Sequence, residues 1–206
     1  MGRESGTTGY SATISLRDVV TALLAAAVLV LVVTAGDESP DHLAEDVPAV
    51  APLSDMVEPV QLEIPSINVD ATVRPTGIAA DGTIEVPPLD QPQIAGWYDV
   101  GPSPGQPGAA VILGHLTTPE RGVFYDLASL DEGALIEVSR ADGSVAVFAV
   151  DRVTSTAKSA FPVVDVYGPA DGAVLRLITC GGEVDEDTLQ YEGNVIAYAS
   201  LVEWND

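Results

Sequence analysis

Short apolar segments separated by glycine, proline and aspartate run from Val60 almost to the C-terminus, and this pattern constrains the fold most strongly. The segments are enriched in β-branched residues and end at turn residues, which is typical of strands. Eight of them at this spacing predict an all-β domain, either a sandwich or a closed barrel. The predicted strands are Val60–Ile64, Ile67–Val73, Thr83–Val86, Ala109–Leu113, Leu135–Ser139, Val145–Thr154, Val174–Cys180 and Asn194–Val202.

Local signals refine this pattern. Ala109–Leu113 is apolar throughout and predicts a central strand. Asp142-Gly143 predicts a hairpin turn between the strands on either side of it. Short helical turns are expected only at Val123–Leu130 and Val163–Tyr167. The chain shows no internal repeat, and its β part is long enough for one ordinary core.

A long segment rich in proline and glycine, Pro87–Gly108, interrupts the strands. A connection of this length within a compact domain is usually functional. It contains Gly96-Trp97-Tyr98, and Trp97 is a candidate wall of a substrate groove. Packing of Trp97 in the core is the alternative.

The N-terminal region contains an uncharged run of Ala, Val and Leu over residues 19–35. As a helix it would be roughly 25 Å long, the short end of a bilayer span. We predict an uncleaved transmembrane anchor; a cleaved signal peptide and a buried helix are the alternatives. The predicted organisation is a cytoplasmic N-terminus (1–18), the anchor (19–35), an acidic spacer with prolines (36–58) and a catalytic domain (59–206).

The formal net charge is −23, which excludes nucleic acid and anionic lipid surfaces as partners. One acidic cluster lies in the spacer, and a second comprises Glu183, Asp185, Glu186, Asp187 and Glu192. Negative charge near a thiol disfavours the thiolate. Neither cluster has a recognised calcium-ligand spacing, so no metal and no cofactor are expected.

Cys180 is the only cysteine, so on an exported chain it has no intramolecular disulfide partner. It is either a small buried group or a nucleophile, and its place at a strand end before Gly181-Gly182 favours the nucleophile. Of the two histidines, His42 lies in the spacer, whereas His115 directly follows a predicted strand and its glycine. If the two strands are parallel neighbours, the imidazolium lies near the thiol and lowers its pKa.

Three elements together resemble the sortase family: Gly114-His115, the segment Gly122–Leu127, and Leu175–Gly182 around the cysteine. Gly96-Trp97-Tyr98 and Tyr191-x-x-Asn194 are similar to the actinobacterial class F sortases. The resemblance extends from Val60 to Val202.

The resemblance implies an eight-stranded β-barrel and a cysteine transpeptidase on the extracellular side of the plasma membrane, held by a single span. Such enzymes cleave a Leu-Pro-x-Thr-Gly-like C-terminal sorting signal of secreted proteins and join it to an amine of peptidoglycan precursor type. By this resemblance Cys180 is the nucleophile, His115 is the general acid and then the base, and Thr179 shapes the groove.

The sequence departs from the family in one respect. Sortases carry an arginine about a dozen residues after the cysteine, but Gly181–Asp206 contains neither Arg nor Lys. The position falls at Glu192, Gly193 or Asn194. Asn194 and Arg176, which shares strand parity with Cys180, are the candidate substitutes as oxyanion or substrate donors.

The missing arginine leaves an alternative function open: a sortase-fold protein with weak or no turnover that binds envelope peptides. A third class, the L,D-transpeptidases, expects Ser-His-Gly-Cys at the nucleophile, which Ile178-Thr179-Cys180-Gly181 does not provide.

Overall fold

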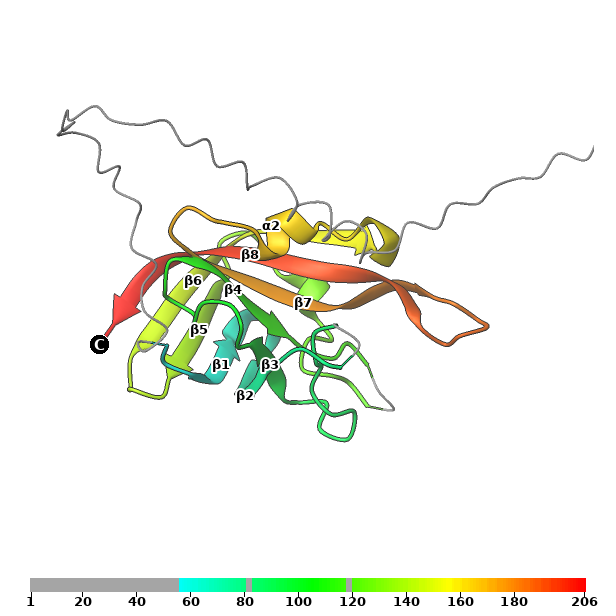
Figure 1. Ribbon diagram of the computed structural model, residues 1–206, viewed down its shortest axis with the longest axis horizontal. Helices are drawn as coiled ribbons and strands as arrows, with labels where there is room; N and C mark the ends of the chain where they lie inside the picture. The colour runs from blue at the N-terminus through cyan, green and yellow to red at the C-terminus, as the bar shows by residue number, and fades with distance from the viewer. Residues whose placement is uncertain (1–55, 81–82, 118–119) are drawn as a thin grey trace, which may run out of the picture. The chain divides into compact units, whose positions relative to one another are not determined.

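The computed structural model describes residues 56–80, 83–117 and 120–206, and within them eight strands close into a barrel (Figure 1). Around the barrel the strands follow the order β1-β2-β3-β4-β7-β8-β6-β5, and β5 pairs with β1 to close it. The strands are β1 (Pro59–Ile64), β2 (Val69–Thr76), β3 (Ala95–Tyr98), β4 (Gly108–Leu113), β5 (Leu135–Arg140), β6 (Val145–Ala157), β7 (Ala173–Val184) and β8 (Tyr191–Asn205).

The short helices are η2 (Pro65–Ile67), η3 (Leu127–Ser129), η4 (Lys158–Ala160) and α2 (Val163–Tyr167). The helical turns predicted from the sequence are therefore confirmed at η3 and α2. The expectation that there would be no others was wrong, since η2 and η4 also form, and η2 takes up Ile67, the predicted first residue of a strand. The hairpin predicted at Asp142-Gly143 is also confirmed, because β5 and β6 pair antiparallel on either side of it.

One predicted strand is wrong and one real strand was missed. Thr83–Val86 forms only an isolated bridge, between Ile84 and Ile78. Pro87 and Pro88 follow it and have no N–H to extend a ladder. The third strand is instead β3, inside the segment predicted to be a loop; it pairs parallel with β2 and antiparallel with β4.

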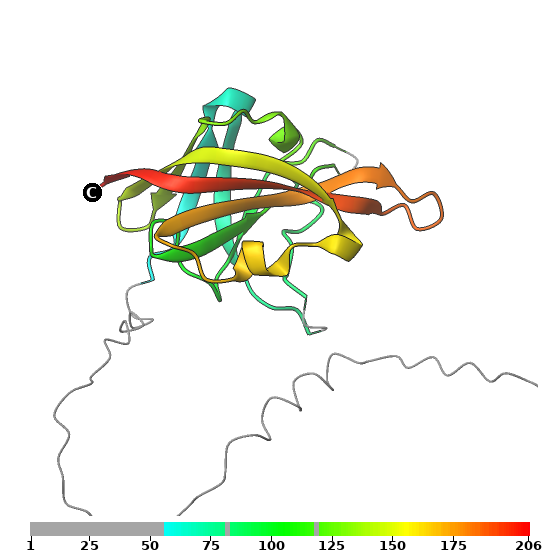
Figure 2. The same cartoon turned by 90° about the horizontal axis from the view of Figure 1, so that it is seen from above.

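The apolar character of β4 follows from burial on both faces. Ala110 and Ile112 point into the barrel core, whereas Val111 packs in a second cluster with Val166 of α2. That second cluster also contains Ile178, Ile196 and Tyr198, from β7 and β8. Figure 2 shows α2 lying along this outer face of the barrel.

The predicted anchor, residues 19–35, and the predicted spacer up to residue 55 lie outside the described residues. In the part of the chain that the structure describes, no helix has the length and apolarity needed to cross a bilayer.

Candidate active site

The parallel pairing of β4 with β7 brings His115 and Cys180 together. In this register Leu113 lies opposite Ile178, and the Gly114 N–H donates to the Ile178 carbonyl over 3.0 Å. His115 and Cys180 are each two residues beyond that pair, Cys180 within β7 and His115 just after the end of β4. Neighbouring strands of a sheet lie about 4.8 Å apart. The expectation that these two strands are parallel neighbours is confirmed.

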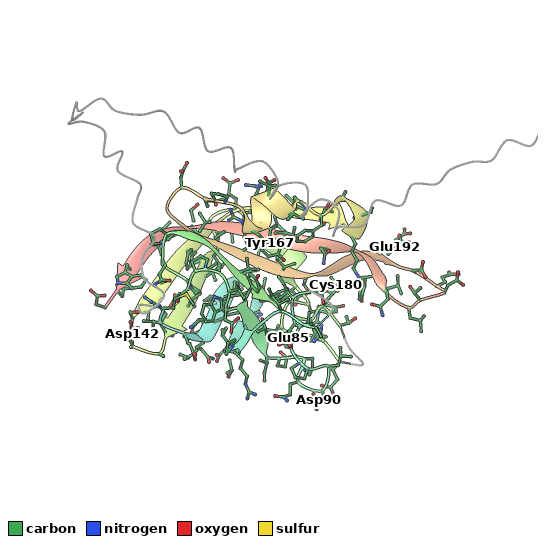
Figure 3. All side chains as sticks on the ribbon, in the orientation of Figure 1. Glu85, Asp90, Asp142, Tyr167, Cys180 and Glu192 are labelled. Carbon is green, nitrogen blue, oxygen red and sulfur yellow. The ribbon has the colours of Figure 1, made fainter. Side chains whose placement is uncertain are left out.

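Both side chains line one cavity of about 790 Å³, which we call the groove. Cys180 and His115 are half-buried there. Figure 3 shows Cys180 on β7, with Glu192 farther along the hairpin formed by β7 and β8. The groove is lined by Val86, Pro87, Leu89, Leu113, Gly114, His115, Thr117, Ile178, Thr179, Cys180, Val184, Leu189, Gln190, Tyr191 and Asn194.

The backbone around His115 is fixed by two glycines that the sequence motif contains. A Cβ at Gly114 would lie 2.5 Å from side-chain atoms of Phe124 and Val123. A Cβ at Gly122 would lie 2.1 Å from the His115 carbonyl oxygen. The Phe124 N–H also donates to that oxygen, over 3.0 Å. The segment after His115 therefore folds back tightly against it.

The His115 ring has one hydrogen-bond partner within the groove wall. Its Nε2 lies 2.7 Å from the carbonyl oxygen of Pro87. Because a carbonyl oxygen only accepts, Nε2 is the donor and carries the hydrogen. This leaves Nδ1 as the nitrogen with a lone pair in the neutral ring.

Asn194 lies directly opposite Cys180 in the antiparallel register of β7 and β8. Its Nδ2 donates to the Thr179 carbonyl over 3.2 Å, which uses one of its two amide hydrogens. Directly opposed residues share a face of the sheet, so the Asn194 side chain lies beside the thiol. Its second amide hydrogen remains for a group bound in the groove.

The other two positions considered for the family arginine do not offer a donor to the groove. A Cβ at Gly193 would lie 2.7 Å from the Thr156 carbonyl oxygen and 3.1 Å from that of Gly181, so no side chain fits. Glu192 is exposed and does not line the groove. Of the three positions, Asn194 alone presents a side chain there.

Trp97, predicted as a wall of the substrate groove, and Arg176, predicted as an oxyanion or substrate donor, both lie away from the groove. Trp97 is 2% exposed and packs in the barrel core, where its Nε1–H donates to the Pro102 carbonyl over 3.2 Å. Arg176 shares a face with Cys180, as its parity predicted, but α2 covers that part of the face. The Arg176 Nε donates to the Asp165 carbonyl over 3.2 Å, and burial lowers the pKa of its guanidinium. Neither side chain lines the groove.

No cation among the described residues lines the groove. Four arginines instead stack on aromatic rings: Arg121 on Tyr125, Arg140 on Trp204, and both Arg152 and Arg176 on Tyr198. His115 is therefore the one basic side chain among the described residues that line the groove.

Thr117 and Tyr191 are groove residues whose contact the sequence did not indicate. Their hydroxyl oxygens are 2.7 Å apart and join the segment after His115 to the start of β8. Tyr191 was present in the Tyr-x-x-Asn element, but nothing in the sequence paired it with Thr117. Thr179 also borders the groove; it is 3% exposed, and its hydroxyl has no hydrogen-bond partner among the described residues.

The acidic cluster after Cys180 lies along the hairpin of β7 and β8: Glu183 is in β7 and Glu192 is in β8, whereas Asp185, Glu186 and Asp187 are in the turn between them. Asp185 accepts hydrogen bonds from the backbone N–H of Thr188 (2.7 Å), its hydroxyl (2.8 Å) and the Asp187 N–H (3.0 Å). These bonds, chiefly those from Thr188, lower the pKa of Asp185. Asp185 therefore closes the turn, and the other acids of the cluster are exposed.

A closed eight-stranded barrel with a thiol on one strand, β7, and an imidazole just after the end of its parallel neighbour, β4, has the arrangement of a cysteine transpeptidase. A sortase-domain family model matches residues 62–202, and the chain therefore belongs to the sortase family. Membership of this family implies cysteine transpeptidase chemistry.

Solved sortase structures share the fold. Sortase C-1 from Actinomyces oris is 20% identical over 71% of this chain and 76% of its own, with a TM-score of 0.56. Sortase A from Listeria monocytogenes is 16% identical over 71% of this chain and 89% of its own, with a TM-score of 0.54. Sortase C-1 from Streptococcus pneumoniae is 25% identical over 69% of this chain and 66% of its own, with a TM-score of 0.53. No curated protein matched the sequence.

Proposed function

We propose that this sortase is a membrane-anchored cysteine transpeptidase of the actinobacterial class F type. It cleaves a Leu-Pro-x-Thr-Gly-like sorting signal on secreted proteins and joins the new carboxyl end to an amine of the cell envelope, of peptidoglycan precursor type. Its catalytic domain lies on the extracellular side of the plasma membrane.

The observation that supports this proposal is that Cys180 and His115 line one groove beside the parallel pair of strands β4 and β7. In the first step the thiolate attacks the threonine carbonyl carbon. The bond to the glycine nitrogen breaks, and imidazolium His115 protonates the leaving amine. In the second step neutral His115 takes a proton from the incoming amine, which attacks the thioester and releases the Cys180 thiolate.

The full chain in detergent tests this function with a Leu-Pro-x-Thr-Gly peptide and two acceptors, a short glycine peptide and a stem-type side-chain amine. Intact-mass measurement is expected to show Cys180 carrying the peptide up to its threonine. Chromatography is expected to show a ligated product once amine is added. Peptide that stays uncut and unattached, with or without amine, overturns the proposal.

The lack of an arginine or lysine among the described residues that line the groove supports the alternative, a sortase-fold protein that binds envelope peptides with little turnover. Losing one preorganised oxyanion donor typically costs about 2.7–4 kcal/mol. In the same experiment, saturable binding of the peptide without cleavage or an acyl-enzyme is the result that selects this alternative.

The proposed location is tested on intact cells. Added protease is expected to digest residues 59–206 while membrane fractionation retains the N-terminal segment. Full protection of the catalytic domain, or its recovery in the soluble fraction, contradicts an extracellular anchored enzyme.

Replacing His115 by glutamine is expected to lower the transpeptidation rate by about a hundredfold to ten-thousandfold, the usual contribution of an acid–base group. Because the ring is half-buried and the surrounding backbone is fixed through the His115 carbonyl, the fold should persist. Initial rates and thermal unfolding of the same preparation check this. Loss of the folded state would instead mark His115 as structural.

Replacing Asn194 by alanine removes the amide opposite the thiol and is expected to lower kcat about threefold to tenfold, corresponding to one neutral hydrogen bond. The Thr179 carbonyl also loses its donor, so thermal unfolding is measured in parallel. Asn194→Gln is the matched control, since it keeps the amide and displaces it by one methylene. Wild-type kcat in Asn194→Ala would exclude Asn194 as a transition-state donor.

A further inference from the structure

The segment Val86–Leu89, which we call the strap, borders the groove on the side of His115. It contributes no charged or nucleophilic side chain. Its contribution to the site is the Pro87 carbonyl oxygen, which accepts a hydrogen bond from His115 Nε2 over 2.7 Å. The question is whether the strap holds that oxygen firmly enough to orient the ring.

The sequence of the strap makes its backbone stiff. Pro87 and Pro88 have φ fixed by their rings. Val86 and Pro87 each precede a proline, which restricts both to extended conformations. The Pro88 carbonyl then accepts from the Gln91 N–H over 3.0 Å, so the chain turns immediately after the strap. The direction of the Pro87 carbonyl is therefore set by local sterics.

The strap rests on a glycine of the barrel. A Cβ at Gly96 would lie 3.1 Å from Pro87 Cγ, 3.2 Å from Pro87 Cδ and 2.7 Å from Thr76 Cγ2. Gly96 also pairs with Leu113, two residues before His115. The missing side chain at Gly96 therefore allows the strap to lie close to the strand that leads into His115.

We propose that the Pro87 carbonyl is the positioning group of His115. It holds the hydrogen on Nε2 and orients the ring, so that Nδ1 exchanges the proton with Cys180 and with the reacting amine. A third group of this kind orients the base in nucleophile–base pairs generally. Here the group is an uncharged main-chain oxygen, and its position depends on Pro88 and Gly96. The inference rests on the proposed function for its catalytic part only.

Nuclear magnetic resonance of the full chain in detergent, with ¹⁵N-labelled histidine, tests the positioning directly. His42→Gln leaves His115 as the single labelled histidine. The expected signature is one neutral tautomer, protonated at Nε2, with an Nε2–H proton protected from exchange with water. A ring protonated at Nδ1, or an Nε2–H in free exchange, overturns the inference.

Gly96→Ala is expected to move the strap, abolish the protected Nε2–H signal and lower kcat at least tenfold with little change in KM. Gly101→Ala is the matched control, because its Cβ would meet only ordinary contacts, the nearest at 3.6 Å. Gly101→Ala should keep the protected Nε2–H signal of His115 and change kcat by less than twofold. A protected signal and normal kcat in Gly96→Ala contradict the inference.

If Gly96→Ala does not fold, Pro88→Gly gives a second test, since it keeps the Pro87 carbonyl but frees its backbone. Loss of the protected signal with lower kcat is expected, and an unchanged signal overturns the inference.

The proposed transpeptidase function and the positioning role of the Pro87 carbonyl can fail independently of each other. A protected Nε2–H without any ligated product removes only the proposed function, whereas ligation without a protected Nε2–H removes only the positioning role.

Discussion

The full chain with alanine at Cys180 is expected to produce neither acyl-enzyme nor ligated peptide, a loss on the order of 10⁴-fold or more. The thiol is the strongest nucleophile in the groove near neutral pH, because the other described lining residues carry only hydroxyl, amide, imidazole or aliphatic groups, and a hydroxyl ionises far less readily than a thiol. The measurement combines intact-mass detection of the thioester with chromatography of the ligation product.

Cys180→Ala should leave the fold unchanged, because the side chain lies half-buried at the groove wall and alanine removes a single atom from it. Thermal unfolding within about 2 °C of the parent chain is the expected control. Cys180→Ser keeps the size of the side chain but is expected to be nearly as inactive, since a hydroxyl ionises far less readily than a thiol near neutral pH. Retained ligation in Cys180→Ala would place the nucleophile elsewhere.

The proximity of Cys180 and His115 was predictable because each follows an apolar run of residues and lies beside a glycine. The predicted strand end at Cys180 was wrong, however, since β7 continues to Val184. Strand ends that share a direction meet at the same edge of a sheet, and here β4 and β7 are parallel neighbours. The remaining groove chemistry was harder to predict. A main-chain acceptor such as the Pro87 carbonyl leaves no residue-type signal, and the Thr117–Tyr191 contact joins segments 74 residues apart.

The third strand was missed for a different reason. β3 has four residues and contains a glycine, so its apolar pattern is too short to stand out from a Pro-Gly-rich segment. Thr83–Val86 has the stronger local pattern, but it lies directly before two prolines. Tertiary pairing with β2 and β4, not local preference, decides which segment joins the barrel.

Arg176 shows what the alternation of side chains along a strand can and cannot predict. Alternation correctly places its side chain on the same face as Cys180, but parity does not tell what covers that face. The Asp165 carbonyl of α2 accepts from Arg176, whose guanidinium also lies over the Tyr198 ring at 4.7 Å. A short helix from elsewhere in the chain thus removes the arginine from the groove.

Trp97→Ala is expected to destabilise the barrel by about 3–5 kcal/mol, the usual cost of removing a large aromatic side chain from a core. Trp97 is 2% exposed, and its neighbours across β3 are Pro75 of β2 and Ile112 of β4. Because single domains are stable by only about 5–15 kcal/mol, this loss approaches the whole margin in a less stable domain. Urea unfolding of the full chain, followed by circular dichroism in one detergent, measures it.

Trp97→Phe is the matched control, because it keeps most of the apolar volume and loses the hydrogen bond from Nε1 to the Pro102 carbonyl. Trp97→Phe is expected to lower the free energy of unfolding by about 1–2 kcal/mol. Peptide affinity of the folded fraction should be unchanged in both variants, since Trp97 does not line the groove. An unchanged urea midpoint together with lost peptide affinity would contradict this prediction. It would indicate that Trp97 contacts the substrate, since such a residue affects binding without affecting unfolding.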